Sequence, residues 1–423
     1  MKIQVDCSLV IKRRTIVYFQ YKERDRQFTG GNVMAREKYN VQKEHEIVGM
    51  YPAIKGMELA GGGDSKLFEV PEYPRFYRPI DTRENFKMLF RGETPYWMVN
   101  NGWVFCDINE FRPRQNPDCI AHHQCLDGGP YIDYSKRPKV TKGWFGLELE
   151  WEPLSAGATT RPGNPIMPDI SEWKEVLQWP DLDEIDFEEM GEMNKEYLGT
   201  DKANQLGIQL GLWERMMCLM DVDNAAMALM DEDVEEDVIA FLDKLSDMYV
   251  DYIGRVIKVC HIDSVMLHDD WGTQNGPFFS LDTAIKFFVP PMKKIVDFCH
   301  ANDIIFEHHC CGKAERLVPA MVMTGEDFWF PQAAINDVDA LIEKYKDEHI
   351  TFAVSSPVLP TGSTPEEIRK IAYDFVEKYK DKGVLFCQDV SLDGKPGHDS
   401  SLYPIFADAV YEYSRIAYQD VED

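Results

Sequence analysis

Short apolar runs alternate with helical patterns along most of this 423-residue chain, and this alternation constrains the fold more than any other feature. Such runs, rich in β-branched and aromatic residues and followed by a helical pattern, are typical of buried parallel strands. Strands are predicted at residues 96–100, 146–151, 206–212, 264–267, 304–307, 328–330, 351–354 and 384–386. Helical patterns lie between most of them, for example at residues 238–259 and at 364–379, where Thr364-Pro365-Glu366-Glu367 is a capped start.

Eight strands that alternate with helices predict an α/β fold, a (β/α)8 barrel of the TIM type with insertions. A doubly wound α/β sheet is the alternative. The chain contains neither a Gly-x-Gly-x-x-Gly motif after a strand nor a phosphate loop, which makes that alternative weaker.

The first 80 residues do not follow the barrel pattern. Residues 8–20 have β character with a polar interruption that suggests a hairpin, and glycines at residues 30–31 and 61–63 indicate loops. We therefore expect a β-containing N-terminal extension, residues 1–80, and a barrel domain, residues 81–423. The extension is expected to cover a barrel edge or to mediate self-association into a homo-oligomer.

Charge and composition exclude several classes of partner. A formal net charge of −28 disfavours nucleic acid and acidic membrane surfaces, which would repel the chain. No apolar run approaches the roughly 18 residues of a membrane span, and the N-terminus lacks the layout of a secretory signal. Ten cysteines without disulfide-framework spacing favour a reducing compartment. These features predict a cytoplasmic enzyme.

Three of the predicted strands are followed immediately by residues of types that commonly bind metals. The side chains beyond the C-terminal ends of barrel strands share one mouth, so residues far apart in the chain can meet there. They are His268, Asp269 and Asp270 after the first of these strands, His308, His309, Cys310 and Cys311 after the second, and Cys387 after the third.

Alternation along an extended chain decides which of these side chains face the mouth. His309 and Cys311 are two residues apart and share a face, whereas Cys310 and His308 point the other way and are better explained as core residues. Thiolate and imidazole ligands favour zinc, and three protein ligands with a variable fourth position are typical of catalytic zinc. Taken alone, Cys387 is better explained as a buried core cysteine.

The stretch from Asp263 to Cys387 resembles the uroporphyrinogen decarboxylase superfamily, and in particular its corrinoid-linked methyltransferase branch. The resemblance rests on His309-Cys310-Cys311-Gly312 at a strand end, on the later Cys387, and on residues 82–86 and 91–95; it extends over residues 82–418. It implies that His309, Cys311 and Cys387 bind a catalytic zinc ion. It also implies methyl transfer to or from the cobalt of a corrinoid.

The corrinoid is expected on a separate partner protein that docks over the barrel mouth. This chain carries no Asp-x-His-x-x-Gly corrinoid-binding motif. The nearest string, residues 347–352, lacks the glycine.

Aromatic residues near the expected mouth suggest a flat substrate, because rings stack well on such walls. The alternative is that the tryptophans fill the core. We predict the substrate-binding residues to be Trp103, Trp213, Trp271, Asn275, Phe278 and Phe279.

Of the two adjacent acids after the strand at 264–267, we expect Asp270 to face the mouth, because His268 then shares its side; a one-residue register error would reverse this. His268 and Asp270 are the predicted catalytic residues. The zinc or Asp270 would bind or protonate the oxygen of a methoxylated aromatic while cobalt(I) takes the methyl group, an O-demethylation.

Three other functions remain open at the level of sequence. Methyl transfer from a methylated corrinoid to the thiol of coenzyme M would use the same zinc motif. Uroporphyrinogen decarboxylase itself needs no metal and binds its carboxylates through arginines, but residues 96–102 contain none. A non-enzymatic accessory that holds a corrinoid or stores metal would need the ligands but no aromatic pocket.

Overall fold

The computed structural model describes residues 36–58, 67–70, 72–101, 106–133, 136, 138–152 and 157–420. The hairpin predicted at residues 8–20, and the predicted substrate residue Trp103, lie outside the described residues.

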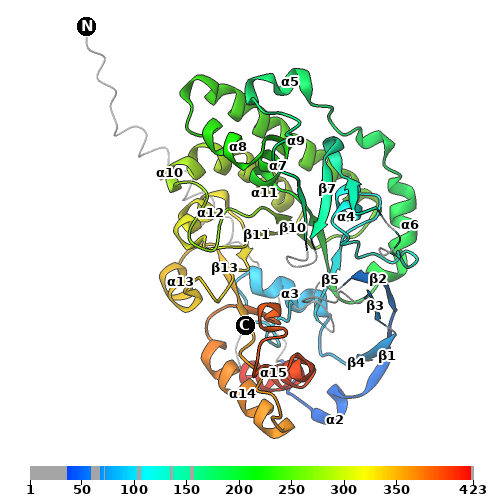
Figure 1. Ribbon diagram of the computed structural model, residues 1–423. Coiled ribbons are helices and arrows are strands. Elements are labelled where there is room, and N and C mark those ends of the chain that lie inside the picture. Colours follow the sequence, from blue (N-terminus) through cyan, green and yellow to red (C-terminus); the bar gives the residue numbers. More distant parts are fainter. Residues whose placement is uncertain are drawn as a thin grey trace.

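A curled sheet of seven parallel strands forms the centre of the molecule, with helices packed around it (Figure 1). Its order is β14-β13-β12-β11-β10-β9-β5. The strands are β5 (Ile108–Phe111), β9 (Ala203–Ile208), β10 (Ser264–His268), β11 (Ile305–His309), β12 (Phe328–Trp329), β13 (Thr351–Ser355) and β14 (Leu385–Cys387). A parallel bridge joins Asn100 to Phe386 of β14, so the predicted first strand lies against the last one. The predicted TIM-type α/β fold is confirmed.

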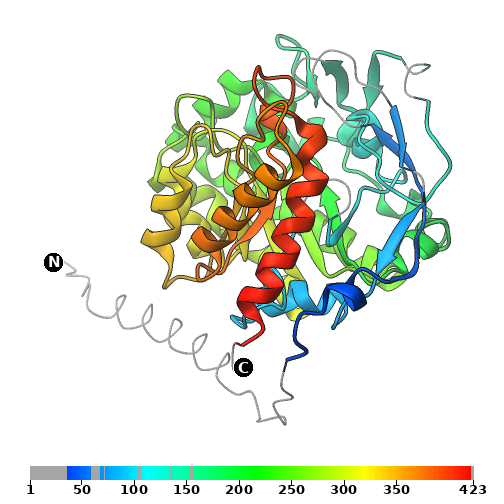
Figure 2. The ribbon, with the colours of Figure 1, turned by 90° about the horizontal axis from the view of Figure 1, so that it is seen from below.

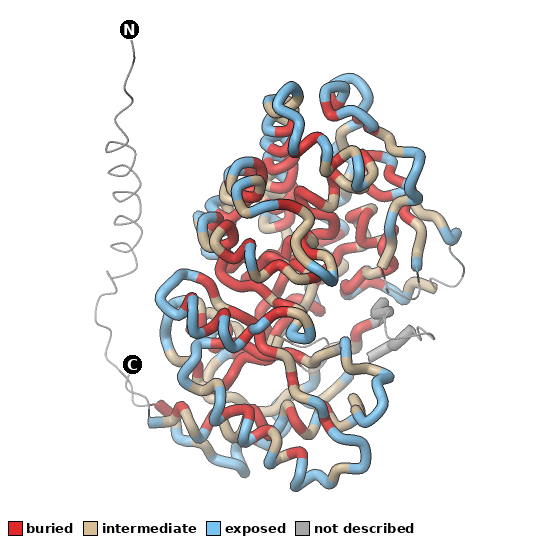
Figure 3. Tube along the Cα trace, turned by 60° about the vertical axis from the view of Figure 1, so that its left-hand side comes forward, coloured by how far each residue is buried: buried red, intermediate tan, exposed pale blue. Residues whose placement is uncertain are grey.

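The helices cover the sheet with their apolar faces. Their bounds are α3 (Thr82–Phe90), α4 (Pro117–Ala121), α5 (Trp173–Val176), α6 (Phe187–Leu198), α7 (Leu212–Met220), α8 (Val222–Ala228), α9 (Glu235–Val259), α10 (Leu281–Thr283), α11 (Val289–Ala301), α12 (Val318–Thr324), α13 (Val338–Tyr345), α14 (Pro365–Tyr379) and α15 (Tyr403–Tyr418). On α9 the buried positions recur every three or four residues, from Val238 to Val256, as expected of an amphipathic helix. Figure 3 shows the buried segments running through the middle of the molecule.

The capped helix start predicted from the sequence is present at α14. The hydroxyl of Thr364 accepts a hydrogen bond from the backbone N–H of Glu367, whose carboxylate in turn accepts one from the backbone N–H of Thr364. This capping box satisfies two backbone donors at the helix N-terminus.

One predicted barrel strand is assigned to the wrong sheet. Residues 146–151 overlap β7 (Glu148–Glu152), which pairs antiparallel with β6 (Val140–Lys142) and β8 (Gly157–Thr160) in a separate sheet. The barrel strand at this point is instead β5, which pairs in parallel with β9. At residues 96–100 the structure has a single bridge, Asn100 to Phe386, in place of the predicted strand. The predicted barrel strands from residue 206 onward agree with the structure to within a few residues.

The described part of the N-terminal region contains α2 (Val41–Glu44) and two antiparallel strand pairs. β1 (Ile47–Tyr51) pairs with β4 (Tyr73–Phe76), and β2 (Ile54–Glu58) pairs with β3 (Leu67–Val70). The carboxylate of Glu44 forms a fully buried ion pair with Arg415 of α15 at 2.8 Å. Figure 2 shows α15 running beside α14. None of the helices in the described ranges is both long and apolar enough to span a membrane.

Candidate metal centre

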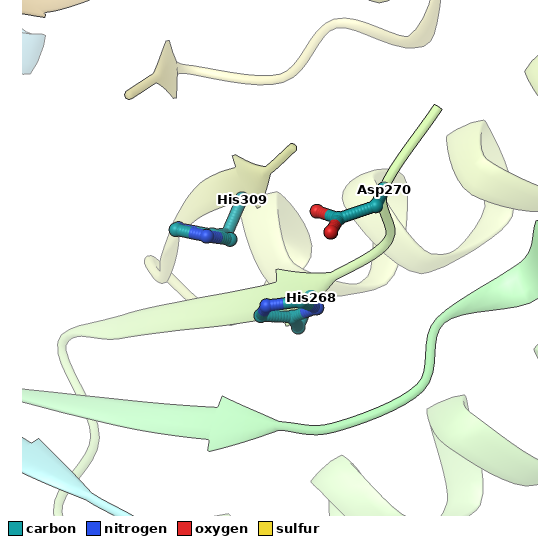
Figure 4. A group of neighbouring side chains, drawn as sticks. All are labelled: His268, Asp270 and His309. Carbon is teal, nitrogen blue, oxygen red and sulfur yellow. The ribbon is translucent and has the colours of Figure 1, made fainter. Parts of the chain in front are cut away.

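Three side chains with metal-binding groups gather at the C-terminal ends of two adjacent strands. His268 ends β10, His309 ends β11, and Asp270 lies two residues after His268 (Figure 4). One donor atom from each lies within 4.8 Å of the other two. The parallel register pairs His268 with His309, and their rings stack with centroids 4.6 Å apart. The structure therefore brings together three of the residues predicted from the sequence.

Cys311 lies against this group. Its Sγ is 3.5 Å from Nε2 of His309, and its backbone N–H donates to the Asp270 carboxylate at 2.6 Å. In a tetrahedral zinc site, an imidazole nitrogen and a thiolate sulfur bound to the same ion lie about 3.5 Å apart, given the usual bond lengths. The pair therefore has the spacing of two ligands that share one ion.

Cys387 ends β14 and is buried, and its thiol donates to the carbonyl of Gln388 at 3.3 Å. Among the residues that the structure describes, it does not belong to a compact group of three metal-binding side chains. Its role as the third zinc ligand thus rests on the sequence resemblance.

The neighbouring residues point into the protein, as alternation predicts. Asp269, His308 and Cys310 have no exposed surface. The Asp269 carboxylate accepts hydrogen bonds from the backbone N–H of Glu214 and from Nε1 of Trp271, each at 2.9 Å. Asp269 thus ties the segment after β10 to the start of α7.

Two glycines hold the loops after β10 and β11 together. A Cβ added to Gly272 would lie 2.8 Å from backbone atoms of Cys311, Gly312 and Lys313. Gly312 has a φ of +81°, and a Cβ there would lie 2.3 Å from the backbone of Gly272. Because each contact is with backbone, neither position accepts a side chain without displacing the loop that carries Cys311.

Glu214 of α7 belongs to the site and was not predicted from the sequence. Its Oε2 lies 2.7 Å from Nδ1 of His268. A signal was available, because Glu214 and Arg215 are the only charged residues in the helix Leu212–Met220, whose other residues are all apolar. The contact fixes the ring of His268 so that Nε2 remains for other partners.

Burial dominates the protonation of these groups. It raises the pKa of Glu214 to about 7, and the neighbouring Asp270 adds to this while His268 opposes it. Burial alone would lower the pKa of His268, but Glu214 and Asp270 outweigh it and raise the pKa to about 9. The pKa of His309 is held well below its ordinary value by burial and by His268, so its ring is neutral and has a free electron pair for a metal.

The thiols near the site are protonated in the absence of a cation. Burial raises the pKa of Cys311 well above its usual range, and Asp270 raises it further. Burial likewise raises the pKa of Cys387. Metal binding at these sulfurs would release protons, so it should weaken as the pH falls.

The predicted aromatic substrate contacts are mostly inside the protein. Trp213 and Trp271 have no exposed surface, and both pack against Phe279 and Phe288. Phe278 is half-buried against Trp213, whereas Asn275 is exposed. The two tryptophans therefore pack behind the mouth and do not face solvent. Of the predicted substrate-binding residues that the structure describes, Phe278 and Asn275 have exposed surface that a ligand could contact.

Comparison with known proteins gives one match by sequence model. The model of the family described as uroporphyrinogen decarboxylase (URO-D) matches residues 166–387, more than half of the chain. No curated protein matches the sequence.

Among solved structures, a methyltransferase from Methanosarcina mazei is similar over 81% of this chain and 98% of its own, with 13% identity and a TM-score of 0.49. The catalytic domain of a Bacillus sp. JAMB-750 GH26 endo-beta-1,4-mannanase is similar over 54% and 72%, with 12% identity and a TM-score of 0.31. At these values neither structure bears on the activity.

Proposed function

Because this chain belongs to the uroporphyrinogen decarboxylase (URO-D) family, we propose that it is a zinc-dependent methyltransferase. It would move a methyl group between a small substrate and the cobalt of a separate corrinoid protein. The observation that carries the proposal is the 3.5 Å approach of Cys311 Sγ to His309 Nε2 at a barrel strand end.

The metal would be held by His309 and Cys311, with Cys387 as the proposed third ligand. Asp270 is the alternative third ligand, since its carboxylate lies in the same compact group as His309. A zinc ion held by cysteine thiolates would bind a thiolate or an ether oxygen of the substrate and polarise it.

The remaining groups position the substrate and a proton. Glu214 orients His268, whose Nε2 is then available to donate a hydrogen bond to the oxygen that loses its methyl group. Asp270 is held by the backbone N–H of Cys311, so its position is fixed relative to the metal ligands. The hydrogen bond from His268, together with the metal, would stabilise a departing phenolate, while the Asp270 carboxylate would hold the loop that carries Cys311 in place.

The substrate proposed is a methoxylated aromatic. The half-buried ring of Phe278 supports this choice, because it offers an apolar surface backed by Trp213. A small thiol such as coenzyme M has less apolar surface to bury than a methoxylated aromatic, so its binding would require a smaller apolar surface on the protein.

Decarboxylation of a substrate with many carboxylates is less well supported. Arg112 forms an ion pair with Glu110, and Arg215 forms a fully buried pair with Asp118. Both guanidinium groups are already neutralised by carboxylates of the chain itself. A substrate with several carboxylates would have to displace these partners.

The test mixes the purified protein, a methoxylated aromatic and a separately purified corrinoid protein in its cobalt(I) state. We expect the phenol and methylcobalt to form in equal amounts, and nothing to form without the corrinoid protein. His309→Ala should abolish the transfer because it removes a ligand, whereas His45→Ala, a remote and exposed histidine, should leave it unchanged.

Three outcomes would contradict the proposal in different ways. Consumption of methylcobalt by coenzyme M, with methoxyaromatics inert, would assign the thiol reaction instead. Binding of corrinoid without any methyl transfer would point to an accessory role. Full activity after complete removal of metal would exclude the zinc mechanism.

A further inference from the structure

A second group of metal-binding side chains lies at the end of the barrel opposite the mouth. His300 is in the last turn of α11, Asp327 immediately precedes β12, and His349 lies between α13 and β13. One donor atom from each lies within 4.8 Å of the other two. These segments lead into the N-terminal ends of the strands, whereas the candidate metal centre follows their C-terminal ends.

The carboxylate of Asp327 is the fixed centre of this group. Its Oδ2 accepts from the backbone N–H of Phe306 at 2.6 Å, and the backbone of Asp327 bonds to Phe306 on one side and Thr351 on the other. Asp327 is therefore held between the sheet segments of β11 and β13. A ligand anchored on both sides in this way keeps its position when the other ligands change.

The two histidines approach this carboxylate from different directions. Nε2 of His300 lies 2.9 Å from Oδ2, and Nε2 of His349 lies 2.9 Å from Oδ1. Their ring planes are nearly perpendicular, at 89°, with centroids 6.2 Å apart. Two rings converging on one carboxylate from different sides are arranged as ligands around a point rather than as a stack.

Solvent reaches the group through an open cavity of about 880 Å³, whose wall includes all three residues. The side chains of His300 and His349 are 21% and 43% exposed, whereas that of Asp327 is 6% exposed. Burial opposes ionisation of Asp327, but the hydrogen bonds from His300 and His349 lower its pKa below the ordinary value. The anion is thus ready for a cation that enters from the cavity.

We propose that His300, Asp327 and His349 form a second divalent-metal site that binds Zn²⁺ or Co²⁺ at the base of the barrel. Two imidazoles and one carboxylate are ligands that these ions accept, with water in the fourth position. The ion replaces the protons that now lie between each ring and Asp327. Those protons move to Nδ1 or to solvent.

Binding requires only a small local rearrangement, because each imidazole nitrogen already lies 2.9 Å from an oxygen of Asp327. Nitrogen and oxygen ligands around a tetrahedral zinc ion lie about 3.3 Å apart, given bond lengths of about 2.0 Å. His349 can adjust by the few tenths of an ångström required, because it lies in the turn between α13 and β13. The site would tie α11 to the sheet, and the N-terminal face of such barrels serves stability rather than catalysis.

The experiment uses the full chain after removal of metal with a chelator, followed by titration with Co²⁺. We expect two ions per chain with different spectra. One shows thiolate-to-cobalt charge-transfer absorbance from the Cys311 site, and the other lacks it because it has only nitrogen and oxygen ligands. His349→Gln and His300→Gln should each remove the second ion and leave the first.

The chain offers a matched control for these variants. His261 also contacts a carboxylate, with Nε2 3.0 Å from Oδ1 of the buried Asp263, but no third ligand completes a group among the described residues. His261→Gln should leave both ions in place. Excess Zn²⁺ should also raise the melting temperature of Cys311→Ala, and this rise should disappear when His349→Gln is added.

The two proposals fail in different ways. A wild-type protein that binds one ion, with the thiolate signal, overturns the second site and leaves the proposed function intact. A wild-type protein that binds one ion without the thiolate signal, and loses it in His349→Gln, overturns the proposed zinc site at the mouth and supports the second site. Two ions that both survive in His349→Gln and His300→Gln place the extra ion elsewhere and overturn the assignment.

Discussion

At the residue scale, the proposed chemistry depends on Cys311 and His309. Replacing Cys311 with alanine should remove most of the zinc bound at the mouth, because it deletes a sulfur that lies 3.5 Å from the neighbouring ligand nitrogen. The helical circular dichroism should stay largely intact, since Cys311 lies beyond the strand end and is only half-buried. Metal analysis together with far-ultraviolet circular dichroism measures both quantities.

The control for this variant is Cys218→Ala, which removes another half-buried thiol, on α7. It should retain the zinc. Cys387→Ala should behave like Cys311→Ala if Cys387 is the third ligand. Wild-type zinc content in Cys387→Ala would assign that position to Asp270 instead.

Glu214 is a positioning residue, because it reaches the site through His268. Glu214→Gln keeps the shape of the side chain but removes the charge that holds Nδ1 of His268 at 2.7 Å. Replacing a residue that holds an active-site group by a hydrogen bond commonly lowers activity about 10–100-fold, so we expect kcat to fall by a factor of that size. KM and zinc content should change little.

Steady-state kinetics and metal analysis of the same preparation test this expectation. The matched control is Glu377→Gln, an exposed glutamate near the C-terminus of α14, at the end of the helix that lies away from the mouth. A Glu214→Gln enzyme with wild-type kcat would show that His268 needs no carboxylate partner.

At the scale of elements, α7 is held by a buried charge. Arg215 and Asp118 of α4 form an ion pair in which both side chains are fully buried, and Asp118 also accepts from the backbone N–H of Trp144 at 2.8 Å. Asp118→Ala leaves a buried guanidinium without its partner, which typically costs about 3–5 kcal/mol of unfolding free energy. Urea unfolding measures this loss.

The double variant Arg215→Met with Asp118→Leu separates charge from packing. Replacing both partners with apolar residues of similar size should be far less destabilising than Asp118→Ala alone. If the double variant is as unstable as the single one, the hydrogen bond to Trp144 rather than the unpaired charge explains the loss.

Most elements of the barrel were predictable because their strands are apolar and are followed by helices. β5 was missed because its sequence, Ile108-Asn109-Glu110-Phe111, is half polar and places Asn109 and Glu110 inside the fold. Residues 146–151 have a good strand pattern, but local pattern does not reveal whether the partner strand is parallel or antiparallel. Pairing is decided by distant residues.

The candidate site was predictable only along the extended segments after the strands, where successive side chains alternate between two faces. Alternation separates His309 and Cys311 from Cys310, and it places Asp270 rather than Asp269 toward the mouth. It says nothing about helices that arrive from elsewhere, which is why Glu214 was missed. Nor does it distinguish an aromatic wall from an aromatic core, so the sequence left both explanations open, and the full burial of Trp213 and Trp271 supports the core explanation for these two residues.

At the scale of the whole molecule, the N-terminal region is bound to the last helix. We predict that residues 1–80 are dispensable for metal binding but needed for the oligomeric state or for closure of the pocket. A chain that begins at Thr82 also loses Glu44 and the carbonyl of Glu37, which both accept hydrogen bonds from Arg415, so it should be less stable than the full chain. Sizing, urea unfolding and metal analysis of this truncated chain test the three expectations.

A point variant distinguishes loss of the ion pair from loss of the segment. Glu44→Gln in the full chain should reproduce much of the destabilisation while leaving the oligomeric state unchanged. A truncated chain with wild-type stability, size and turnover would contradict any role for the region.

The backbone contact between Gly272 and Gly312 sets a boundary for anyone who wishes to redirect this protein to new substrates. If these two codons were randomised in a library of mouth variants, most of the variants would fold incorrectly at this point. Any side chain at either position would collide with main-chain atoms of the opposite loop. Asn275 and Phe278 follow Gly272 by a few residues and have free surface. A small library confined to such positions, with both glycines kept, would sample specificity without disturbing the ligands.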